Sequence, residues 1–588
     1  MISASGANSD PSGNEDSSVT TVALDLSANT SGVTIVQETS DSGFIPSIAG
    51  NIILGSGDDS VTSTNGILIG DLAFGDGADV FSLNSSAYFG ALSDSDGNLE
   101  LTVENGSNIS QRTTDAINVT NATFDSTSNF TTAIDGVTGE AGTLIATNNI
   151  TFEDGAEVGL TLNNVLANDS ETFALVSADN LDIQGAIEDL DSSVSPFLYD
   201  VTYGLADNDN TLVVTLDLRS TEQLGLDARQ AATFTSAFEA LANNAELGQA
   251  FTAITEEAEF NSAFNQLLPE ISASPLYFIQ SNVDGAVGAV GSHLENARRS
   301  QERSGGAWLQ QFTYFADREQ DELSEQFRGF GFGFASGIDT SWGPFHTVGA
   351  NLAFASSQVE DVLGVDEDLD IVTYQVGAYA GAEKNNFSLD LYAGAGYSDI
   401  ESNRLVRFGN FSGTSRAEWN ATHYNGSARL GYTAELGEQF WVRPTVGFDY
   451  LRLEEDSFRE TGQAGIALGV EGRTSERAGA TALLNVGALF NGNRTWIRPS
   501  LRAGFRTDFI SDPILTEFQF INLTDSAGNL FDGQLAETLS GEIPDSAVIL
   551  GFSIGAGSKW SSFSFDFDSD IRDGFIRHTG RVVVRLLF

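Results

Sequence analysis

The stretch Arg-His-Thr-Gly-Arg-Val-Val-Val-Arg-Leu-Leu-Phe, residues 577–588, alternates apolar and polar side chains. Successive side chains of a strand point to opposite faces, so this segment has two distinct faces. One face carries Val582, Val584, Leu586 and Phe588. The other carries Arg577, Arg581 and Arg585. An arginine facing lipid at the bilayer midplane costs roughly 2–4 kcal/mol, so the basic face needs a wet lumen. The segment therefore predicts one strand of a transmembrane β-barrel.

The preceding segments repeat this pattern with matching charges. In 559–571, phenylalanines alternate with the acids Asp566, Asp568 and Asp570. In 494–510, apolar residues alternate with the arginines Arg498, Arg502 and Arg506. We expect these charged residues to face the lumen, where the acidic and basic rows of adjacent strands neutralise each other.

Twelve such segments follow one another from about residue 306. They are about 306–317, 326–340, 345–360, 369–383, 386–402, 419–436, 439–455, 475–491, 494–510, 545–557, 559–571 and 574–588. An even number places both barrel ends on the same side of the membrane. Short links predict periplasmic turns, and 403–418, 456–474 and 511–544 predict long extracellular loops. A soluble β-sandwich or a large soluble barrel is the alternative, although neither has a reason to end in an aromatic strand of this kind.

A helix is predicted directly before the barrel, at 275–303. Apolar residues recur at helical spacing there, and Ser274 and Pro275 suit its first turn. Gly285, Gly288 and Gly291 each cost a helix roughly 1 kcal/mol. Small residues are worth that cost if the helix threads a narrow pore, and the glycines 329, 331 and 333 leave space inside the barrel. A surface linker helix is the alternative.

Composition separates the N-terminal part from the barrel. Residues 1–297 hold 43 acids and 3 bases, whereas residues 298–588 hold 39 acids and 24 bases. This acidity argues against a nucleic-acid partner, because phosphate binding needs a basic face. The absence of cysteine excludes disulfides and thiolate metal sites. The first residues have no charged and apolar leader, so we expect a signal peptide to be missing from this sequence.

The N-terminal part predicts a right-handed parallel β-helix. Leu-Gly-Ser-Gly-Asp-Asp-Ser-Val at 54–61 resembles Phe-Gly-Asp-Gly-Ala-Asp-Val-Phe at 74–81, and a fainter copy lies at 152–158. A turn followed by a short apolar strand, about every 20 residues, is typical of stacked coils. We expect a passenger at 1–220, whose part at about 97–218 is a C-terminal cap. A helical linker at 221–274, the pore helix at 275–303 and the barrel at 304–588 complete the predicted organisation.

Together these features resemble a classical autotransporter of type V secretion. The resemblance is carried by Leu-Leu-Pro-Glu-Ile-Ser at 267–272, Gly-Ala-Trp at 306–308, Phe-Arg-Gly-Phe-Gly at 327–331 and the closing segment 577–588. It implies that the barrel anchors in outer-membrane lipid, that the helix fills its pore and that the passenger reaches the cell surface. It also implies a cap that helps the passenger to fold. The closing strand, with Val582, Val584, Leu586 and Phe588, resembles the signal read by the barrel assembly machinery.

Residues with obvious chemistry are sparse, so we predict no catalytic residue, metal site or cofactor. The Gly-Asp repeats resemble half of a calcium nonapeptide site, but only two are present, one coil apart, so plain turns are the favoured interpretation. The four histidines are scattered without ligand spacing.

Three functions remain. The favoured one is an adhesive or surface-interacting passenger with an unknown extracellular ligand. The alternatives are a polysaccharide-acting enzyme passenger and a pore-forming barrel with a periplasmic N-terminal domain.

Overall fold

The computed structural model describes residues 2–3, 21–39, 45–192, 195–269, 274–299, 306–319, 326–361, 367–492, 494–511, 514–525, 527–539, 544–558 and 561–586. The chain divides into two compact units. The first contains residues 1–226, 241–263 and 408–411, and the second contains 227–240, 264–407 and 412–588. Each unit is described by itself.

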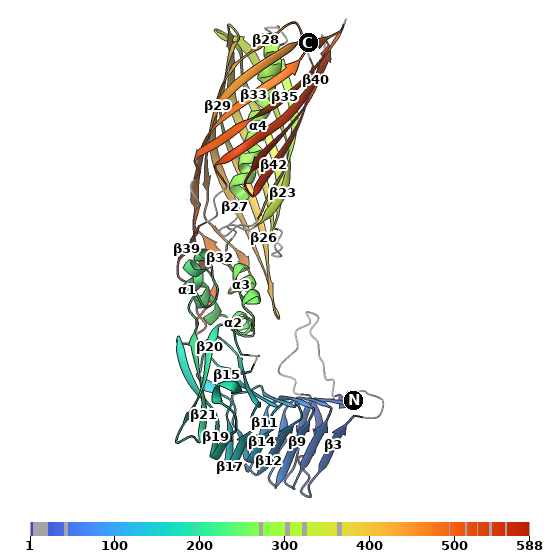
Figure 1. Cartoon of the computed structure of the whole chain (residues 1–588), viewed down its shortest axis with the longest axis vertical. Coiled ribbons are helices and arrows are strands. Elements are labelled where there is room, and N and C mark those ends of the chain that lie inside the picture. Colours follow the sequence, from blue (N-terminus) through green and yellow to red (C-terminus); the bar gives the residue numbers. More distant parts are fainter. Residues whose placement is uncertain are drawn as a thin grey trace. The chain divides into compact units, whose positions relative to one another are not determined.

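The first unit is a β-helix of three sheets (Figure 1), which confirms the predicted architecture. One sheet holds β1 (Ile2–Ser3), β4 (Ser47–Ala49), β7 (Ile67–Ile69), β10 (Ala87–Gly90), β13 (Asn108–Gln111), β15 (Asn129–Asp135), β16 (Glu140–Ala141) and β18 (Glu157–Leu162). A second holds β2 (Val22–Asp25), β5 (Asn51–Ile53), β8 (Leu72–Phe74) and β11 (Leu92–Asp94). The third, called the long sheet, holds β3 (Thr34–Glu38), β6 (Ser60–Thr64), β9 (Asp79–Asn84), β12 (Leu99–Glu104), β14 (Ile117–Phe124), β17 (Leu144–Phe152), β19 (Ser170–Ile183), β21 (Thr211–Leu218) and β20 (Tyr199–Ala206).

Parallel pairing stacks each coil on the one 20 residues earlier in the region of the sequence repeat. Val61 pairs with Phe81, and Phe81 pairs with Leu101, so the buried side chains form a continuous column. The glycines of the repeat lie at the tightest approach between coils. A Cβ added at Gly75 would lie 1.6 Å from the carbonyl oxygen of Gly55, so only glycine fits there.

The last coils end in antiparallel pairs. Strand β19 pairs antiparallel with β21, which pairs antiparallel with β20. A short 3-10 helix, η1 (Ile187–Leu190), precedes β20. The pairing therefore changes from parallel to antiparallel within the segment predicted as a cap.

The aspartates of the Gly-Asp repeats bond to the backbone of neighbouring coils. Asp59 accepts a hydrogen bond from the amide of Val33 at 2.6 Å, and Asp79 accepts one from the amide of Asp59 at 2.6 Å. Both carboxylates are buried, and so is Asp94. Burial, reinforced by the charges of Asp94, Asp59 and Asp96 and opposed by the hydrogen bond from Asp59, raises the pKa of Asp79 to about 6. Asp59 and Asp79 therefore act as turn supports. Among the described residues, no three His, Cys, Asp or Glu side chains form a group able to hold a metal ion.

We expect the β-helix to be more stable in mild acid than at neutral pH. Because the pKa of Asp79 in the folded chain is raised from 3.8 to about 6, the folded state keeps a proton that the unfolded state has released. The free energy of unfolding should fall by on the order of 1–2 kcal/mol as pH rises through this window, allowing for partial solvation. Hydrogen exchange of the amides in β6, β9 and β12, corrected for intrinsic rates, measures this. The variant Asp79→Asn should flatten the profile, and protection that increases from pH 5 to pH 7.5 would contradict the expectation.

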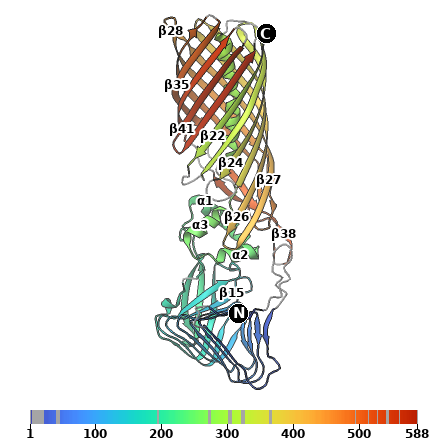
Figure 2. The ribbon, with the colours of Figure 1, turned by 90° about the vertical axis from the view of Figure 1, so that its right-hand side faces the viewer.

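The second unit is built around a closed barrel of twelve antiparallel strands, as predicted (Figures 1 and 2). They are β22 (Gly306–Arg318), β23 (Phe327–Trp342), β24 (Phe345–Asp361), β25 (Glu367–Lys384), β26 (Phe387–Phe408), β27 (Phe411–Tyr432), β29 (Phe440–Glu455), β33 (Arg473–Ala488), β35 (Thr495–Ile510), β40 (Ser546–Ser558), β41 (Ser561–Arg572) and β42 (Phe575–Leu586). Strand β42 pairs with β22 and closes the ring. Two short strands pair with strands of the barrel: β28 (Ala434–Leu436) with β29, and β34 (Phe490–Asn491) with β35.

Side chains alternate along the barrel strands as the sequence predicts. In β23, Phe330, Phe332 and Phe334 are exposed on the outer surface, whereas the glycines that alternate with them, at 329, 331 and 333, are buried. Exposed apolar side chains of this density suit contact with hydrocarbon. No helix in the described part of the chain is both long and apolar enough to span a membrane.

The predicted loop 403–418 is wrong, because most of it continues two strands. Strand β26 runs to Phe408, and β27 starts at Phe411, with Gly409 at a φ of 50° in the turn between them. The polar residues of this segment, such as Arg404 and Ser415, are buried under other parts of the chain. Their partners are distant in sequence, so composition alone indicated a solvated loop.

The other two predicted loops contain further strands. A small sheet joins β30 (Phe458–Arg459), β32 (Leu468–Val470), β36 (Leu515–Phe520) and β39 (Ala536–Leu539). Beside it, β31 (Thr461–Gly462) pairs with β27, and β37 (Leu523–Thr524) pairs with β38 (Leu530–Phe531). We call the segments 456–472 and 514–539 the loop cap.

In the described part of the chain, four helices lie between the β-helix and the first barrel strand in sequence. They are α1 (Ala228–Ala242), α2 (Ala245–Thr252), α3 (Glu257–Asn265) and α4 (Ser274–Arg299). The first three lie within 221–274, the segment that the sequence predicts as a helical linker. Helix α1 contacts the loop cap: Ser236 donates to the carbonyl of Gln534 at 2.9 Å, and Glu239 accepts from the amide of Gln534 at 2.6 Å.

Candidate functional site

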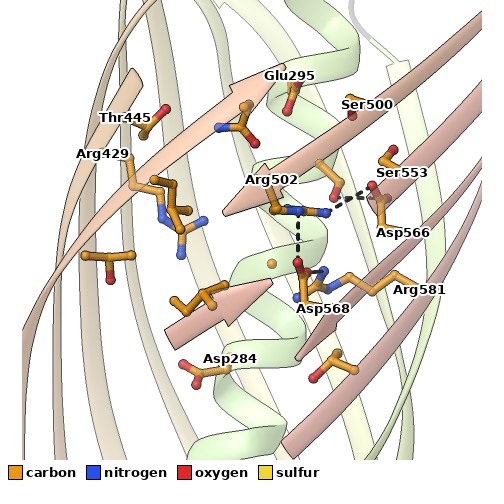
Figure 3. A pocket seen from close by; sticks show the side chains of 18 of the residues that line it. Asp284, Glu295, Arg429, Thr445, Ser500, Arg502, Ser553, Asp566, Asp568 and Arg581 are labelled. Carbon is orange, nitrogen blue, oxygen red and sulfur yellow. Dashed lines mark hydrogen bonds and ion pairs between the residues drawn. The ribbon is translucent and has the colours of Figure 1, made fainter. Parts of the chain in front are cut away.

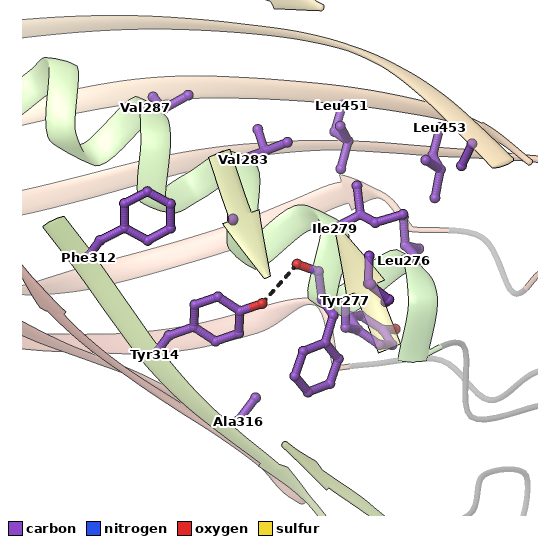
Figure 4. Close-up of a cluster of buried hydrophobic side chains, with 14 of the residues drawn as sticks. Leu276, Tyr277, Ile279, Val283, Val287, Phe312, Tyr314, Ala316, Leu451 and Leu453 are labelled. Carbon is purple, nitrogen blue, oxygen red and sulfur yellow. Dashed lines mark hydrogen bonds between the residues drawn. The ribbon is translucent and has the colours of Figure 1, made fainter. Parts of the chain in front are cut away.

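The described part of the predicted pore helix, α4, lies inside the barrel (Figure 1). Its apolar residues pack against β22 to β25, where they form one cluster with Phe312 and Tyr314 of β22 (Figure 4). Residues 300–303 of the predicted helix lie outside the described residues.

Glycines in β23 make room for the aromatic residues that support the helix. Gly333 pairs with Phe312, and Gly331 pairs with Tyr314 across the two strands. A Cβ added at either glycine would lie 2.4 Å from the Cζ atom of its aromatic partner. The lumenal glycines therefore leave space for inward aromatic side chains of β22, on which α4 packs.

Hydrogen bonds between polar side chains of α4 and the barrel wall fix the position of the helix along the barrel axis. Asn282 donates to the hydroxyls of Ser357 at 3.1 Å and Thr373 at 3.0 Å, and it accepts from Tyr314 at 2.9 Å. Near the other end, His293 bonds to Asp339. A buried polar network of this kind is satisfied in only one register, so it specifies how deep the helix sits.

A charged cavity of about 210 Å³ lies on the opposite side of α4, along β29, β33, β35, β40, β41 and β42 (Figure 3). The predicted lumenal residues that line it are Arg498, Arg502, Arg506, Asp566, Asp568, Asp570, Arg577 and Arg581. Asp568 lies between two arginines, 2.8 Å from Arg502 and 2.6 Å from Arg581. The bare α4 backbone at Gly288 and Gly291 borders the same cavity.

The three helix glycines face different parts of the wall. A Cβ at Gly285 would lie 2.4 Å from the ring of Phe312, one at Gly288 would lie 2.8 Å from Arg581, and one at Gly291 would lie 3.0 Å from Arg429. Because the glycines are three residues apart and the helix has 3.6 residues per turn, successive glycines point in somewhat different directions around the helix axis. Gly285 thus adjoins a rigid ring, whereas the other two adjoin the ends of flexible side chains.

The remaining predicted residues belong to strand β42. Val584 is exposed on the outer surface, and Val582 is half-buried. Arg585 and Leu586 lie in the strand, opposite Ser562 and Ser561, but their side chains are outside the described part of the structure. Phe588 lies outside the described residues altogether.

Sequence reasoning missed the most strongly paired charge in the lumen, Asp508. Its buried carboxylate accepts hydrogen bonds from Arg477 at 2.7 Å, Arg572 at 2.7 Å and Arg506 at 2.9 Å. Arg477 also donates to Gln280 of α4 at 3.0 Å. The group therefore joins three strands to the helix. Asp508 is an even number of residues from Arg502 and Arg506 along β35, so it shares their lumenal face. This alternation is the signal that could have identified it.

A second buried ion pair, Arg404 with Glu460, links the linker, the strand extension and the loop cap. Arg404 donates to Glu460 at 2.6 Å and to the carbonyl of Gln266 at 2.8 Å. Glu460 also accepts from Ser415 at 2.8 Å and from the amide of Leu468 at 2.9 Å. This network fixes the residues shortly before α4 to the loop cap.

We expect Arg404→Met to loosen the loop cap without unfolding the barrel. The substitution leaves the carboxylate of Glu460 buried without its cation, at a cost of roughly 3–5 kcal/mol. Limited proteolysis of the chain in detergent should then cut 456–472 much faster than in the wild type. The exposed pair Arg416–Glu401 provides a control, because Arg416→Met should change the cleavage rate little. Equal cleavage of both variants would contradict the expectation.

Comparison with known proteins identifies the C-terminal region. Residues 307–568 match the model of the Autotransporter beta-domain. The chain is 30% identical over 120 residues to "Esterase EstA" of Pseudomonas aeruginosa, which covers 20% of this chain and 19% of that protein. It is 22% identical over 177 residues to "Outer membrane protein A" of Rickettsia conorii, which covers 30% of this chain and 8% of that protein. The chain thus spans less than a fifth of the length of these relatives.

Two solved structures match about half of the chain. The translocator domain of the autotransporter NalP from Neisseria meningitidis matches with a TM-score of 0.38 and 15% identity, over 52% of this chain and 99% of that one. The transport unit of the autotransporter AIDA-I from Escherichia coli matches with a TM-score of 0.35 and 14% identity, over 51% of this chain and 98% of that one.

The family match runs from β22 into β41, so it includes most of the strands that line the lumen around α4 and stops before β42. The barrel of this chain lies in the outer membrane of a Gram-negative bacterium and supports export of a passenger to the surface. Residues 307–568 therefore belong to the Autotransporter beta-domain family.

Proposed function

We propose that the β-helix is an adhesive, non-enzymatic passenger that binds an extracellular ligand while the barrel anchors it. One observation carries the proposal: the outward side chains of the long sheet are mostly Ser, Thr and Asn, arranged in straight rows by the register of the coils. A broad polar face suits the binding of an extended ligand, whereas catalysis needs a concave site.

The chemistry of the passenger supports binding. The first 220 residues contain no histidine and no cysteine, so they lack the usual base of a hydrolase and a thiol nucleophile. The buried aspartates of the turns are hydrogen-bonded to backbone amides, which is a structural role.

The barrel has two further proposed partners. Outer-membrane lipid would contact exposed apolar side chains such as Phe330, Leu352 and Leu501. The barrel assembly machinery would recognise the last strand, β42, whose outer face includes Val584.

Adhesion of intact cells tests the proposed function. Cells that produce the full chain should adhere to coated surfaces, whereas cells that produce the chain without 21–220 should not. Barrel folding in both is checked by heat-dependent migration in SDS gels. Equal adhesion would contradict the proposal, and so would hydrolysis of ester or glycoside substrates by the purified full chain.

A further inference from the structure

A continuous row of hydroxyl groups crosses the outer face of the long sheet. The register pairs each residue with the next, through the strands β6, β9, β12, β14 and β17 (labelled in part in Figure 1). The members of this hydroxyl row are Thr62, Ser82, Thr102, Thr123 and Thr151. All five are half-buried, and their neighbours along each strand point into the core.

No side-chain hydrogen bond engages any of these five hydroxyls within the part of the chain that the structure describes. Other hydroxyls of the β-helix are engaged. Ser63 bonds to Gln37 at 2.6 Å, and Thr132 bonds to the carbonyl of Gly142 at 2.6 Å. The hydroxyl row therefore retains donors and acceptors that can bond to a ligand.

The side chains of the neighbouring row are hydrogen-bonded to one another. Asn149 donates to Asn121 at 3.0 Å, Asn180 donates to Asn149 at 3.1 Å, and Asn121 donates to Glu100 at 2.9 Å. This asparagine ladder fixes the strands beside the hydroxyl row. Preorganisation of that kind lowers the entropy that binding would otherwise lose.

We infer that the hydroxyl row binds a neutral, linear polysaccharide laid across the strands. Successive hydroxyls lie about 4.8 Å apart, the spacing of paired strands. An extended chain of pyranose rings advances by a similar length per ring and presents a hydroxyl at each step. The ring hydroxyls would exchange hydrogen bonds with the row, and the methyl groups of its threonines would contact the ring carbons.

Charge and polarity argue for this class of ligand. Residues 1–297 carry 43 acids and 3 bases, so the passenger repels anionic polymers, whereas the row itself is uncharged. A protein partner would need large apolar anchors, which the row does not contain. The inference rests on the proposed adhesive function and names its ligand class.

Co-sedimentation tests the inference with the purified full chain in detergent. The probes are microcrystalline cellulose, chitin and curdlan as neutral polymers, and calcium-free alginate beads as the anionic one. The double variant Thr102→Val/Thr123→Val removes two hydroxyls but keeps side-chain shape and strand preference. Thr161→Val is the matched control, because Thr161 is exposed on another sheet of the same β-helix.

We expect the wild type and the control to bind at least one neutral polymer and the double variant to bind it about tenfold more weakly, as two lost hydrogen bonds imply. Equal binding by the double variant, binding to alginate alone, or no binding to any neutral polymer would overturn the inference. Cell adhesion separates the two ideas. If the double variant adheres like the wild type, the hydroxyl row is not the adhesive site, and the proposed function stands.

Discussion

Asp508→Ala is expected to abolish the resistance of the barrel to SDS at temperatures where the wild type stays folded. The carboxylate holds Arg477, Arg506 and Arg572 at 2.7–2.9 Å and is fully buried. Its loss leaves three arginines close together in a site of low dielectric constant. Removing one partner of a buried ion pair typically costs about 3–5 kcal/mol, so we expect a loss at the upper end of that range. Heat-dependent migration in SDS gels measures the result.

Asp449→Ala is the matched control for this variant. Asp449 also faces the lumen, but its nearest arginine nitrogens are 3.6 Å and 3.8 Å away, and its carboxylate is 17% exposed. We expect its loss to lower the unfolding temperature only slightly. If both variants unfold at the same temperature, the three-arginine group is not what holds these strands together.

Gly285→Leu is expected to displace α4 and raise the ion conductance of the barrel severalfold. A Cβ at Gly285 would lie 2.4 Å from Cε2 and 2.5 Å from Cδ2 of Phe312, and a leucine is larger still. Phe312 is itself held in the slot over Gly333, so it has little room to move. Overpacking of this kind costs roughly 1–3 kcal/mol at one position, and the helix can escape it by leaving the wall. Planar bilayer recordings of the purified chain measure the current.

Two further variants make this result specific. Gly291→Leu should leave the current low, because its nearest neighbour is the mobile end of Arg429, 3.0 Å from the added Cβ. The double variant Gly285→Leu/Phe312→Ala should restore a low current, because the alanine vacates the space of the ring. A high current from the double variant, or a low one from Gly285→Leu, would show that this contact does not seat the helix.

The sequence predicted the barrel and its helix because both depend on a local pattern. Apolar and polar side chains alternate in segments such as 494–510 because one face of the strand meets hydrocarbon and the other meets a wet lumen. Glycine disfavours a helix, so three glycines in one helical segment indicated a requirement for small side chains, and a narrow pore imposes that requirement. The 20-residue repeat at 54–81 likewise predicted the β-helix without knowledge of any contact.

The features that were missed depend on partners distant in sequence. Arg404 is buried by residues 266 and 460, so no local pattern distinguished the strand extension from a loop. Asp508 gains its importance from Arg477 and Arg572 on other strands. The hydroxyl row could be recognised only from the register of the coils. Its members are unevenly spaced in sequence: Thr123 follows Thr102 by 21 residues, and Thr151 follows Thr123 by 28.

Protease treatment of intact cells shows on which side of the outer membrane the β-helix lies. We expect the barrel, filled by α4, to anchor the chain and the β-helix to lie outside the cell. Protease added to cells with an unbroken outer membrane should remove epitopes within 21–220 and leave the strands of 306–586 protected. A periplasmic protein serves as the control for membrane integrity. Epitopes in 21–220 that survive until the outer membrane is permeabilised would contradict the account.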